Sequence, residues 1–336
     1  MTGLKDTFFR VIDYLRVSVT DRCNLRCLYC MPPEGVVPSE HKEILSYEEI
    51  VRIIEIGAGL GVRKVRLTGG EPLTRKNISF LISSIKKIRG IEDLSLTTNG
   101  ILLEKYAAEM ASAGLDRVNV SIDSFDPVRY EKITRGGSLE AVLRGISEAE
   151  KAGLRPIKIN MVPIRGVNDD EVIEFASLTF NSDHHVRFIE FMPSGNNDYW
   201  SSDKYITTDE LKKTIETIAP LTPVHMRKDG PSRYFRLKGA RGVIGFISAL
   251  THHFCKECNR LRLTSDGKLR PCLFSETEID LKAAIRSGEP DSEIERLLRL
   301  SIEIKPEGHN ISNIAALKGP EALGTGRRRP MSKIGG

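Results

Sequence analysis

Short apolar runs alternate with amphipathic stretches through the first two-thirds of this 336-residue chain, and this alternation leaves few folds open. Strands are expected at 14–20, 64–68, 94–98, 117–122, 157–162 and 186–191, and helices at 46–57, 78–88, 102–113, 138–152 and 170–178. Such repeats give parallel strands with right-handed crossovers. We expect an α/β fold, a partial (βα)6 TIM-like barrel, although periodicity alone equally allows an open doubly wound sheet.

The pattern changes beyond Tyr199. Helices are expected at 209–218, 276–286 and 292–300, with short β segments at 233–237 and 243–247. The last residues carry three prolines and many glycines, which is typical of an irregular tail. We therefore expect a barrel domain at 1–198, an α+β extension at 199–304 and a tail at 305–336.

Unusual residues follow the predicted strands. Cysteines at 23–30 follow the first strand, Gly69-Gly70-Glu71-Pro72 follows the second, and residues 97–100 follow the third. Parallel strands gather their carboxyl ends at one edge, where ligands bind in barrels and in doubly wound sheets. We expect the active site at this edge.

The six cysteines form two groups of three, Cys23-x-x-x-Cys27-x-x-Cys30 and Cys255-x-x-Cys258 with Cys272. In a reducing compartment, clustered thiols indicate metal rather than disulfides. Three cysteines on a 4Fe–4S cubane leave one iron open to an outside ligand. A zinc site is the alternative for the first group, and it requires a fourth ligand such as His41.

The three-two spacing of the first group, with the aromatic Tyr29 before the last cysteine, resembles the radical S-adenosylmethionine (SAM) superfamily. The resemblance implies that the open iron binds the amino and carboxylate groups of SAM. An electron from the reduced cluster then yields methionine and a 5′-deoxyadenosyl radical. It also implies cofactor contacts for Tyr29, Gly70, Ser121 and Met192, with core packing as the alternative for Met192.

The second group sits on a predicted hairpin. Strands at 259–264 and 268–272, joined by a Ser-Asp-Gly turn, bring Cys272 back beside Cys258. A zinc site completed by His252 or His253 is the alternative here. Arg260 and Arg262 alternate on one face of the outgoing strand, which suits a phosphate-rich ligand, and the chain lacks a P-loop.

The segment 254–274, FCKECNRLRLTSDGKLRPCLF, resembles the GTP 3′,8-cyclase family, which acts in molybdenum cofactor biosynthesis. The likeness extends to residues 14–24, 66–72, 96–100, 158–160 and 188–193 and to the terminal Gly335-Gly336. It implies a radical SAM lyase with two 4Fe–4S clusters that converts GTP to 3′,8-cyclo-7,8-dihydro-GTP. The second open iron would ligate the guanine ring.

The same resemblance assigns roles to single residues. GTP would be bound by Arg16, Arg66, Thr97, Lys158, Arg260 and Arg262. The resemblance also implies a role in catalysis for Arg260 and Arg262. It implies the same for Gly335 and Gly336, because the family's tail reaches the active site. An external electron donor, a downstream cyclic pyranopterin monophosphate synthase and a homodimer are also implied.

The net charge of +5 fits an anionic substrate but also a plain solvated surface. We expect neither a nucleic-acid nor a membrane partner, and a cytoplasmic location, because the apolar runs are short and no signal peptide is visible. Two rivals remain: a radical SAM enzyme that modifies peptides with an auxiliary cluster, and a zinc-stabilised nucleic-acid-binding module. The second would need an extended basic surface.

Overall fold

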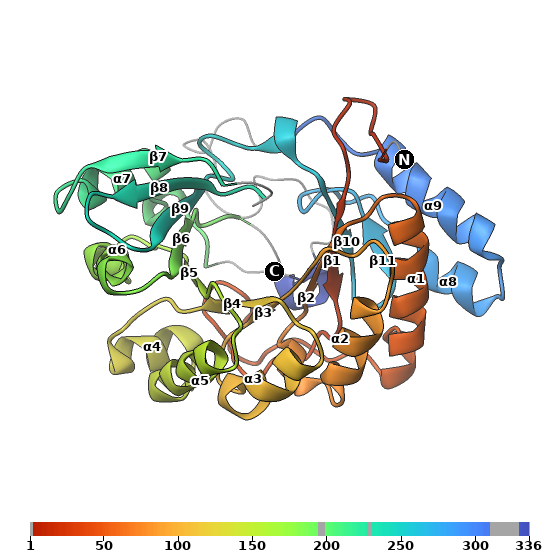
Figure 1. Ribbon diagram of the computed structural model, residues 1–336, viewed down its shortest axis with the longest axis horizontal. Coiled ribbons are helices and arrows are strands. Elements are labelled where there is room, and N and C mark those ends of the chain that lie inside the picture. Colours follow the sequence, from red (N-terminus) through yellow and green to blue (C-terminus); the bar gives the residue numbers. More distant parts are fainter. Residues whose placement is uncertain (1–2, 194–198, 227–229, 310–328, 336) are drawn as a thin grey trace.

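The computed structural model describes residues 3–193, 199–226, 230–309 and 329–335, and its strands form one curved sheet with helices on the outside (Figure 1). The first six strands are β1 (Tyr14–Ser18), β2 (Lys64–Thr68), β3 (Asp93–Thr98), β4 (Arg117–Ser121), β5 (Lys158–Met161) and β6 (His185–Ile189). They lie in chain order and every neighbouring pair is parallel. The predicted α/β architecture is confirmed, and its order is that of a partial barrel.

Six helices cover the outer face of this part of the sheet: α1 (Tyr47–Gly59), α2 (Ile78–Lys86), α3 (Leu103–Ser112), α4 (Pro127–Thr134), α5 (Leu139–Lys151) and α6 (Val172–Asn181). The capping box at Ser46 and Glu49 is present, with both of its hydrogen bonds. Helix α4 was not predicted. Its start is nevertheless encoded, because Asp126 caps it and Pro127 occupies its first turn.

The C-terminal part contains α7 (Thr208–Ile215), β7 (Leu221–Val224), β8 (Arg233–Leu237) and β9 (Val243–Ile247), followed by β10 (Arg260–Leu263), β11 (Lys268–Arg270), β12 (Ile279–Asp280), α8 (Leu281–Arg286), α9 (Asp291–Glu303) and α10 (Met331–Ile334). The predicted helix at 276–286 begins only at Leu281, because Ile279 and Asp280 pair with β11. Strand β7 was missed, since Pro223 argues against a strand; it lies at the sheet edge, where proline is tolerated.

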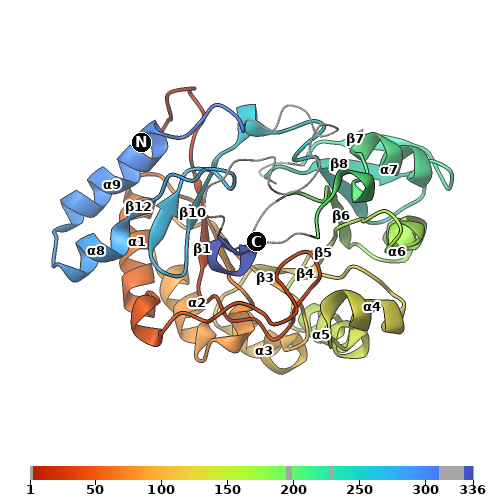
Figure 2. The same ribbon diagram turned by 180° about the vertical axis from the view of Figure 1, so that it is seen from behind.

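The C-terminal strands lengthen the first sheet instead of building a second one. Within the described residues the order is β12-β11-β10-β1-β2-β3-β4-β5-β6-β9-β8-β7. Strand β10 pairs in parallel with β1, and β9 pairs in parallel with β6. Seen from behind, the two C-terminal strand groups flank the barrel strands, and the C-terminal helix α10 lies between them (Figure 2).

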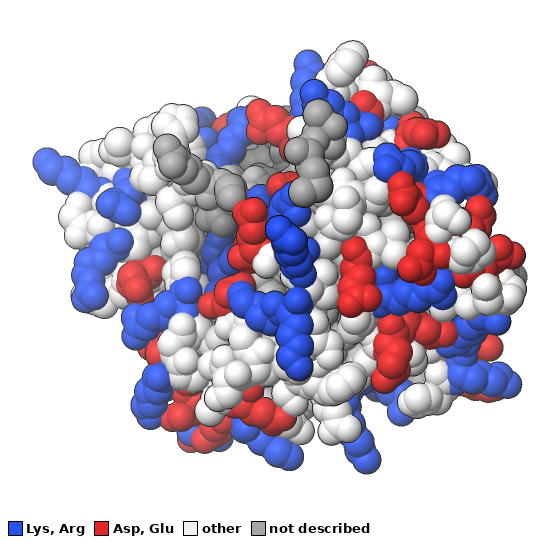
Figure 3. Space-filling view, turned by 45° about the vertical axis from the view of Figure 1, so that its right-hand side comes forward, with Lys and Arg blue, Asp and Glu red and all other residues white. Residues whose placement is uncertain are grey.

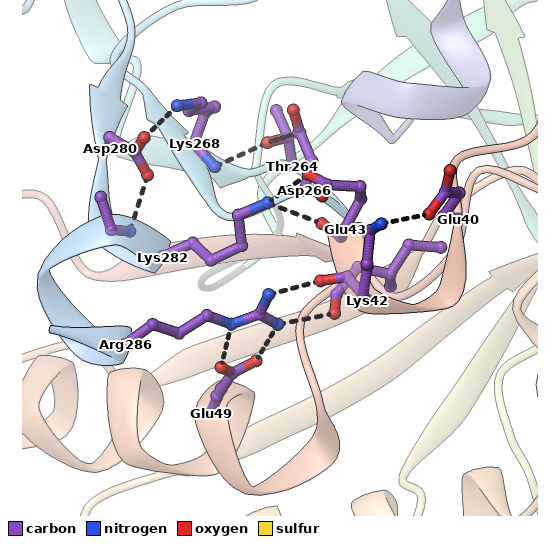
Figure 4. Close-up of polar contacts among 12 residues, drawn as sticks. Glu40, Lys42, Glu43, Glu49, Thr264, Asp266, Lys268, Asp280, Lys282 and Arg286 are labelled. Atoms are coloured by element: carbon purple, nitrogen blue, oxygen red, sulfur yellow. Dashed lines mark hydrogen bonds and ion pairs between the residues drawn. The ribbon is translucent and has the colours of Figure 1, made fainter. Parts of the chain in front are cut away.

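Polar contacts attach α8 to α1 and to the segment before it (Figure 4). Arg286 reaches the carboxylate of Glu49 at 2.7 Å, and Lys282 lies 3.0 Å from that of Glu43. These residues are separated by more than 230 positions in the chain. Positive and negative side chains are interspersed over the face drawn in Figure 3. Among the described residues, no helix is both long and apolar enough to span a bilayer.

Candidate active site

One cavity, with about 2220 Å³ of empty space continuous with solvent, opens inside the curve of the sheet. Both cysteine groups line it: Cys23, Cys27, Cys30, Cys255, Cys258 and Cys272. The first group lies on the loop after β1, and the second lies on the segment that leads into β10 and out of β11. Groups that are 225 residues or more apart in the chain therefore share one chamber.

The spread of the sulfur atoms fits a cluster better than a single metal ion. In each group at least one pair of sulfurs lies more than 4.8 Å apart. Thiolates on one tetrahedral zinc, each about 2.3 Å from the metal, would be only about 3.8 Å apart. A cubane is larger, since each cysteine binds a different iron. Three free thiols at each site are the donor set that a 4Fe–4S cluster with one open iron requires.

The histidines considered as zinc ligands have other surroundings. His252 is bound to Asp209 of α7, with 2.9 Å between Nε2 and the carboxylate. His253 lines the cavity, with its ring 5.3 Å from the ring of His309. His309 in turn contacts the carbonyl oxygen of Ala249 at 2.7 Å.

Alternate residues of the parallel strands point into the cavity, and many of them are cations. Arg16 of β1 is in register with Arg66 of β2 on one side and with Arg262 of β10 on the other. Arg117 and Arg187 continue this lining on β4 and β6. The residues between them, such as Leu15 and Val65, are buried under the helices. The inner wall is thus charged where a TIM barrel usually carries packed apolar layers.

These cations are close enough to affect one another. Burial and then the charge of Arg260 lower the pKa of Arg262 to about 9. Burial and the charge of Arg262 likewise lower the pKa of Arg16. Positive charges held together in a buried wall favour a polyanionic ligand, because its negative groups relieve their repulsion.

The surroundings of the first cysteine group are acidic. Glu71 accepts hydrogen bonds from the amides of Leu73 and Asn99, and Asp123 accepts one from the Tyr29 hydroxyl at 2.5 Å. Burial raises the pKa of Glu71 to about 7 and that of Asp123 to about 6. Burial also raises the pKa of the Cys23 thiol to about 12.

The glycine turn after β2 lies against the cysteine loop. A Cβ atom at Gly70 would lie 2.3 Å from the carbonyl oxygen of Arg22, and one at Gly69 would lie 2.5 Å from that of Thr20. The amide of Gly70 donates to the Thr20 carbonyl at 2.7 Å. Only glycine permits this approach, which brings the turn into the cavity beside the first group.

The surroundings of the second cysteine group are basic. The predicted hairpin is confirmed, with Arg262 paired to Arg270 and Leu263 to Leu269. Although burial alone raises it, the charges of Arg260 and Lys305 lower the pKa of the Cys258 thiol to about 6. The two groups therefore differ in charge: carboxylates lie near the first and cations near the second.

The end of the chain enters the same region. Arg262 donates from Nη1 to the Gly335 carbonyl at 2.6 Å. Arg329 binds both oxygens of Asp266 at 2.7 and 2.8 Å, which attaches the terminal segment to the hairpin turn. Gly336 lies outside the described residues, as do Arg327 and Arg328.

Most of the predicted ligand contacts line the cavity: Arg16, Tyr29, Arg66, Gly70, Thr97, Ser121, Met192, Arg260 and Arg262. Lys158 is not among these lining residues. It is 2% exposed on β5, with Nζ 5.9 Å from the centre of the Tyr234 ring. Its contact with a nucleotide stays a prediction.

Several residues of the site were not predicted. Arg187 could have been found from the alternation in β6, where it points to the same side as His185. Asp123, Arg10 and Lys305 had no such signal, because their partners lie far away in the sequence. Their contacts depend on the tertiary fold.

Comparison with known proteins agrees with this site. Residues 17–179 match the family model of the Radical SAM superfamily, and residues 184–311 match that of Molybdenum Cofactor Synthesis C. A protein of Thermodesulfovibrio yellowstonii named GTP 3′,8-cyclase is 51% identical over 99% of this chain and 100% of its own length.

The chain belongs to the GTP 3′,8-cyclase family. Further members of this family from Petrotoga mobilis and Alkaliphilus metalliredigens are 48% and 50% identical, each over 91% of this chain and 94% of the relative. Membership in a radical SAM enzyme family implies a 4Fe–4S cluster and SAM. The recognition made from the cysteine spacing and the segment 254–274 is thereby confirmed.

Solved structures support the fold of this GTP 3′,8-cyclase family member. Streptococcus suis SuiB bound to S-adenosylmethionine has a TM-score of 0.58 and 15% identity, over 80% of this chain and 63% of that chain. SuiB bound to its precursor peptide SuiA has a TM-score of 0.60, over 93% of this chain and 70% of that chain. At this identity the likeness concerns the fold alone.

Proposed function

We propose that this chain converts GTP to 3′,8-cyclo-7,8-dihydro-GTP, with SAM bound at the first cysteine group and GTP at the second. The observation that carries the proposal is the common cavity: both cysteine groups line it, and so do the adjacent arginines Arg262, Arg16 and Arg66. A reaction between two bound molecules requires both in one enclosed space. The family to which the chain belongs supports GTP as the substrate.

The first cysteine group would hold the cluster that binds SAM. When bound, the cluster and SAM together supply a radical that abstracts hydrogen from the substrate. Gly70 would accept the methionine part from the turn after β2, and Ser121 and Met192 would contact the adenosyl part from the ends of β4 and β6. Tyr29 is fixed by its hydrogen bond to Asp123, which holds the cysteine loop against β4.

The second cysteine group would hold a cluster whose open iron ligates the guanine ring. The triphosphate would be bound by Arg16, Arg66, Arg260 and Arg262. Arg187 of β6, which also lines the cavity, would assist them. Thr97 and Lys158 would complete the substrate contacts, and a role in catalysis stays predicted for Gly335 and Gly336. A guanidinium binds phosphate oxygens through paired, charge-assisted hydrogen bonds. The closely spaced arginines therefore suit GTP better than a neutral substrate.

The predicted division into a SAM-binding part at 1–198, a second-cluster part at 199–304 and a tail at 305–336 remains our proposal for the functional units. A cytoplasmic location, an external electron donor and a homodimer belong to the same proposal. So does a downstream cyclic pyranopterin monophosphate synthase. Free thiols at two cluster sites support a reducing compartment.

The decisive experiment is an anaerobic reaction of the reconstituted chain with GTP, SAM and a reductant. We expect about eight iron atoms per chain, as two 4Fe–4S clusters require. We also expect 5′-deoxyadenosine and the 3′,8-cyclised nucleotide in about equal amounts, because one abstraction yields one product. Turnover of a peptide with no consumption of GTP would instead support the peptide-modifying rival. A colourless chain loaded with zinc would support the other rival, a zinc-stabilised nucleic-acid-binding module.

A further inference from the structure

Lys305 lines the cavity together with the second cysteine group and lies two residues after the end of α9. It is 3% exposed, and its Nζ donates to the carbonyl oxygens of Arg260 at 2.8 Å and Pro271 at 2.6 Å. Arg260 follows Cys258 by two residues, and Pro271 directly precedes Cys272. One buried ammonium group thus joins the two segments that carry these cysteines.

Arg10 makes the matching contact on the third cysteine. Its Nη1 donates to the carbonyl oxygen of Cys255 at 2.7 Å and to that of Glu307 at 2.9 Å, and its Nη2 donates to that of Pro306 at 2.7 Å. The guanidinium is itself held by buried Asp6, 2.5 Å from Nε. Residues 305–307 are therefore joined through two cations to all three cysteine-bearing segments.

Within the described residues, the hydrogen-bond acceptors of Lys305 leave its positive charge without a carboxylate partner. Both of its hydrogen bonds go to neutral carbonyl groups. Burial lowers the pKa of Lys305, and the neighbouring Cys258 and Cys272 act against this lowering. The ammonium group is held on the backbone that flanks these two cysteines. At the first group Arg26 donates to the carbonyl oxygen of Cys23, but carboxylates act on the thiols there, Glu71 on Cys23 and Asp123 on Cys27.

We propose that Lys305 and Arg10 are positioning residues for the second cluster, and that the charge of Lys305 makes this cluster easier to reduce. The proposal rests on the proposed function, because it requires a cluster at the second cysteine group. Hydrogen bonds from the two buried cations fix the backbone at or near each of the three cysteines. A nearby positive charge also stabilises the more negative, reduced state of a cluster.

The test compares Lys305→Met, which keeps the length of the side chain without its charge, with Lys305→Arg, which keeps the charge. After anaerobic reconstitution and desalting, we expect Lys305→Met to lose up to four of about eight iron atoms per chain. The SAM-dependent change in the electron paramagnetic resonance signal of the first cluster should persist. Lys305→Arg should recover most of the iron.

The reduction potential separates charge from packing. In a chain whose first group is replaced by serines, any second cluster that Lys305→Met retains should be reduced at a more negative potential than with Lys305, and Lys305→Arg should reverse the shift. Full retention of iron with an unchanged potential would overturn the proposal. Equal loss of iron from both sites would do so as well, because it would indicate general misfolding.

Two controls complete the design. Lys282 also binds a carbonyl oxygen and a carboxylate, both of Glu43 at 3.0 Å, but it lies on α8 outside the cavity lining (Figure 4). Lys282→Met should keep both clusters. If the unaltered chain itself holds only about four iron atoms, all lost when the first group is replaced, the second cluster of the proposed function fails independently of Lys305.

Discussion

Arg262 and Gly335 are 73 positions apart in the chain, yet Nη1 of the arginine lies 2.6 Å from the carbonyl oxygen of the glycine. The contact is buried, and Arg262 lines the cavity. Gly335 has φ of +81°, and a Cβ atom there would lie 2.6 Å from Cγ2 of Thr68. The end of the chain is therefore fitted to β1, β2 and β10 at once.

This fit predicts that Gly335→Ala displaces the tail. A methyl group would add a collision with Thr68 to the strain of positive φ, which alone costs about 1–3 kcal/mol. We expect cyclised product to fall at least about tenfold while SAM is still cleaved. Gly288→Ala is the matched control, because Gly288 also has φ of +81° but has no atom within 4 Å of the added methyl group. Equal effects of the two substitutions would refute a specific role for the tail.

Glu71 should make the stability of the iron-free chain depend on pH. The pKa of Glu71 is about 7 in the folded chain, above the ordinary value of 4.5. Between pH 4.5 and 7 the folded chain therefore binds more protons at this group than the unfolded chain does. Stability from this group is therefore complete below about pH 4.5 and is lost as pH rises towards 7, by about 3 kcal/mol. In Glu71→Gln the thermal midpoint should fall less across this range than in the unaltered chain.

Glu49 provides a control of opposite sign. Burial opposes the change, but the hydrogen bond from Arg286 lowers the pKa of Glu49, so its contribution is present at neutral pH and is lost in acid. Glu49→Gln should weaken the acid-side loss of stability. Parallel pH profiles for the unaltered chain and Glu71→Gln would show that the buried carboxyl ionises normally.

Single-cysteine variants should separate the two sites. Cys23→Ala should abolish 5′-deoxyadenosine formation and keep about four iron atoms, because only the first cluster loses a ligand. Cys258→Ala should keep the roughly four iron atoms of the first cluster and should still cleave SAM slowly, without forming cyclised product. Iron analysis and chromatography of both products measure this. Normal 5′-deoxyadenosine formation by Cys23→Ala would contradict the assignment of the first group to SAM.

Arg260→Ala should weaken GTP binding roughly 10- to 100-fold, since a hydrogen bond to a charged group contributes about 1.5–3 kcal/mol. Slow, uncoupled SAM cleavage should remain. Equilibrium binding of GTP to the anaerobic chain provides the measurement. Arg299→Ala serves for comparison, because Arg299 pairs with Glu295 on an exposed face of α9. An affinity equal to that of the unaltered chain would remove Arg260 from the nucleotide site.

Local sequence signals predicted most of the barrel. Strand β2 occupies the predicted range, and α1 begins after the predicted cap at Ser46, because periodicity and capping act within a few residues. Helix α4 was overlooked although Asp126 and Pro127 mark its start. The cysteines and the arginines of β10 were identified because their spacing is itself the signal.

The rest depends on contacts between distant segments. Nothing near Lys305 in the sequence indicates that its ammonium group meets the carbonyls of Arg260 and Pro271. The pairing of β10 with β1 and of β9 with β6 was equally unpredicted. Hydrophobic periodicity in the sequence does not indicate which strands pair when they are not consecutive in the chain. The tail at 305–336 was expected to be irregular, yet its first residue helps to order the second cysteine group.

The placement of β9 and β10 affects how the chain can be divided. Removing everything after residue 198 would expose the hydrogen-bonding edges of both β1 and β6, and unpaired edges favour aggregation between molecules. A truncated barrel made to study SAM cleavage alone should therefore precipitate or associate into higher oligomers. The strands that carry the hydrogen-bonding partners of β1 and β6 therefore have to be retained in any shortened chain.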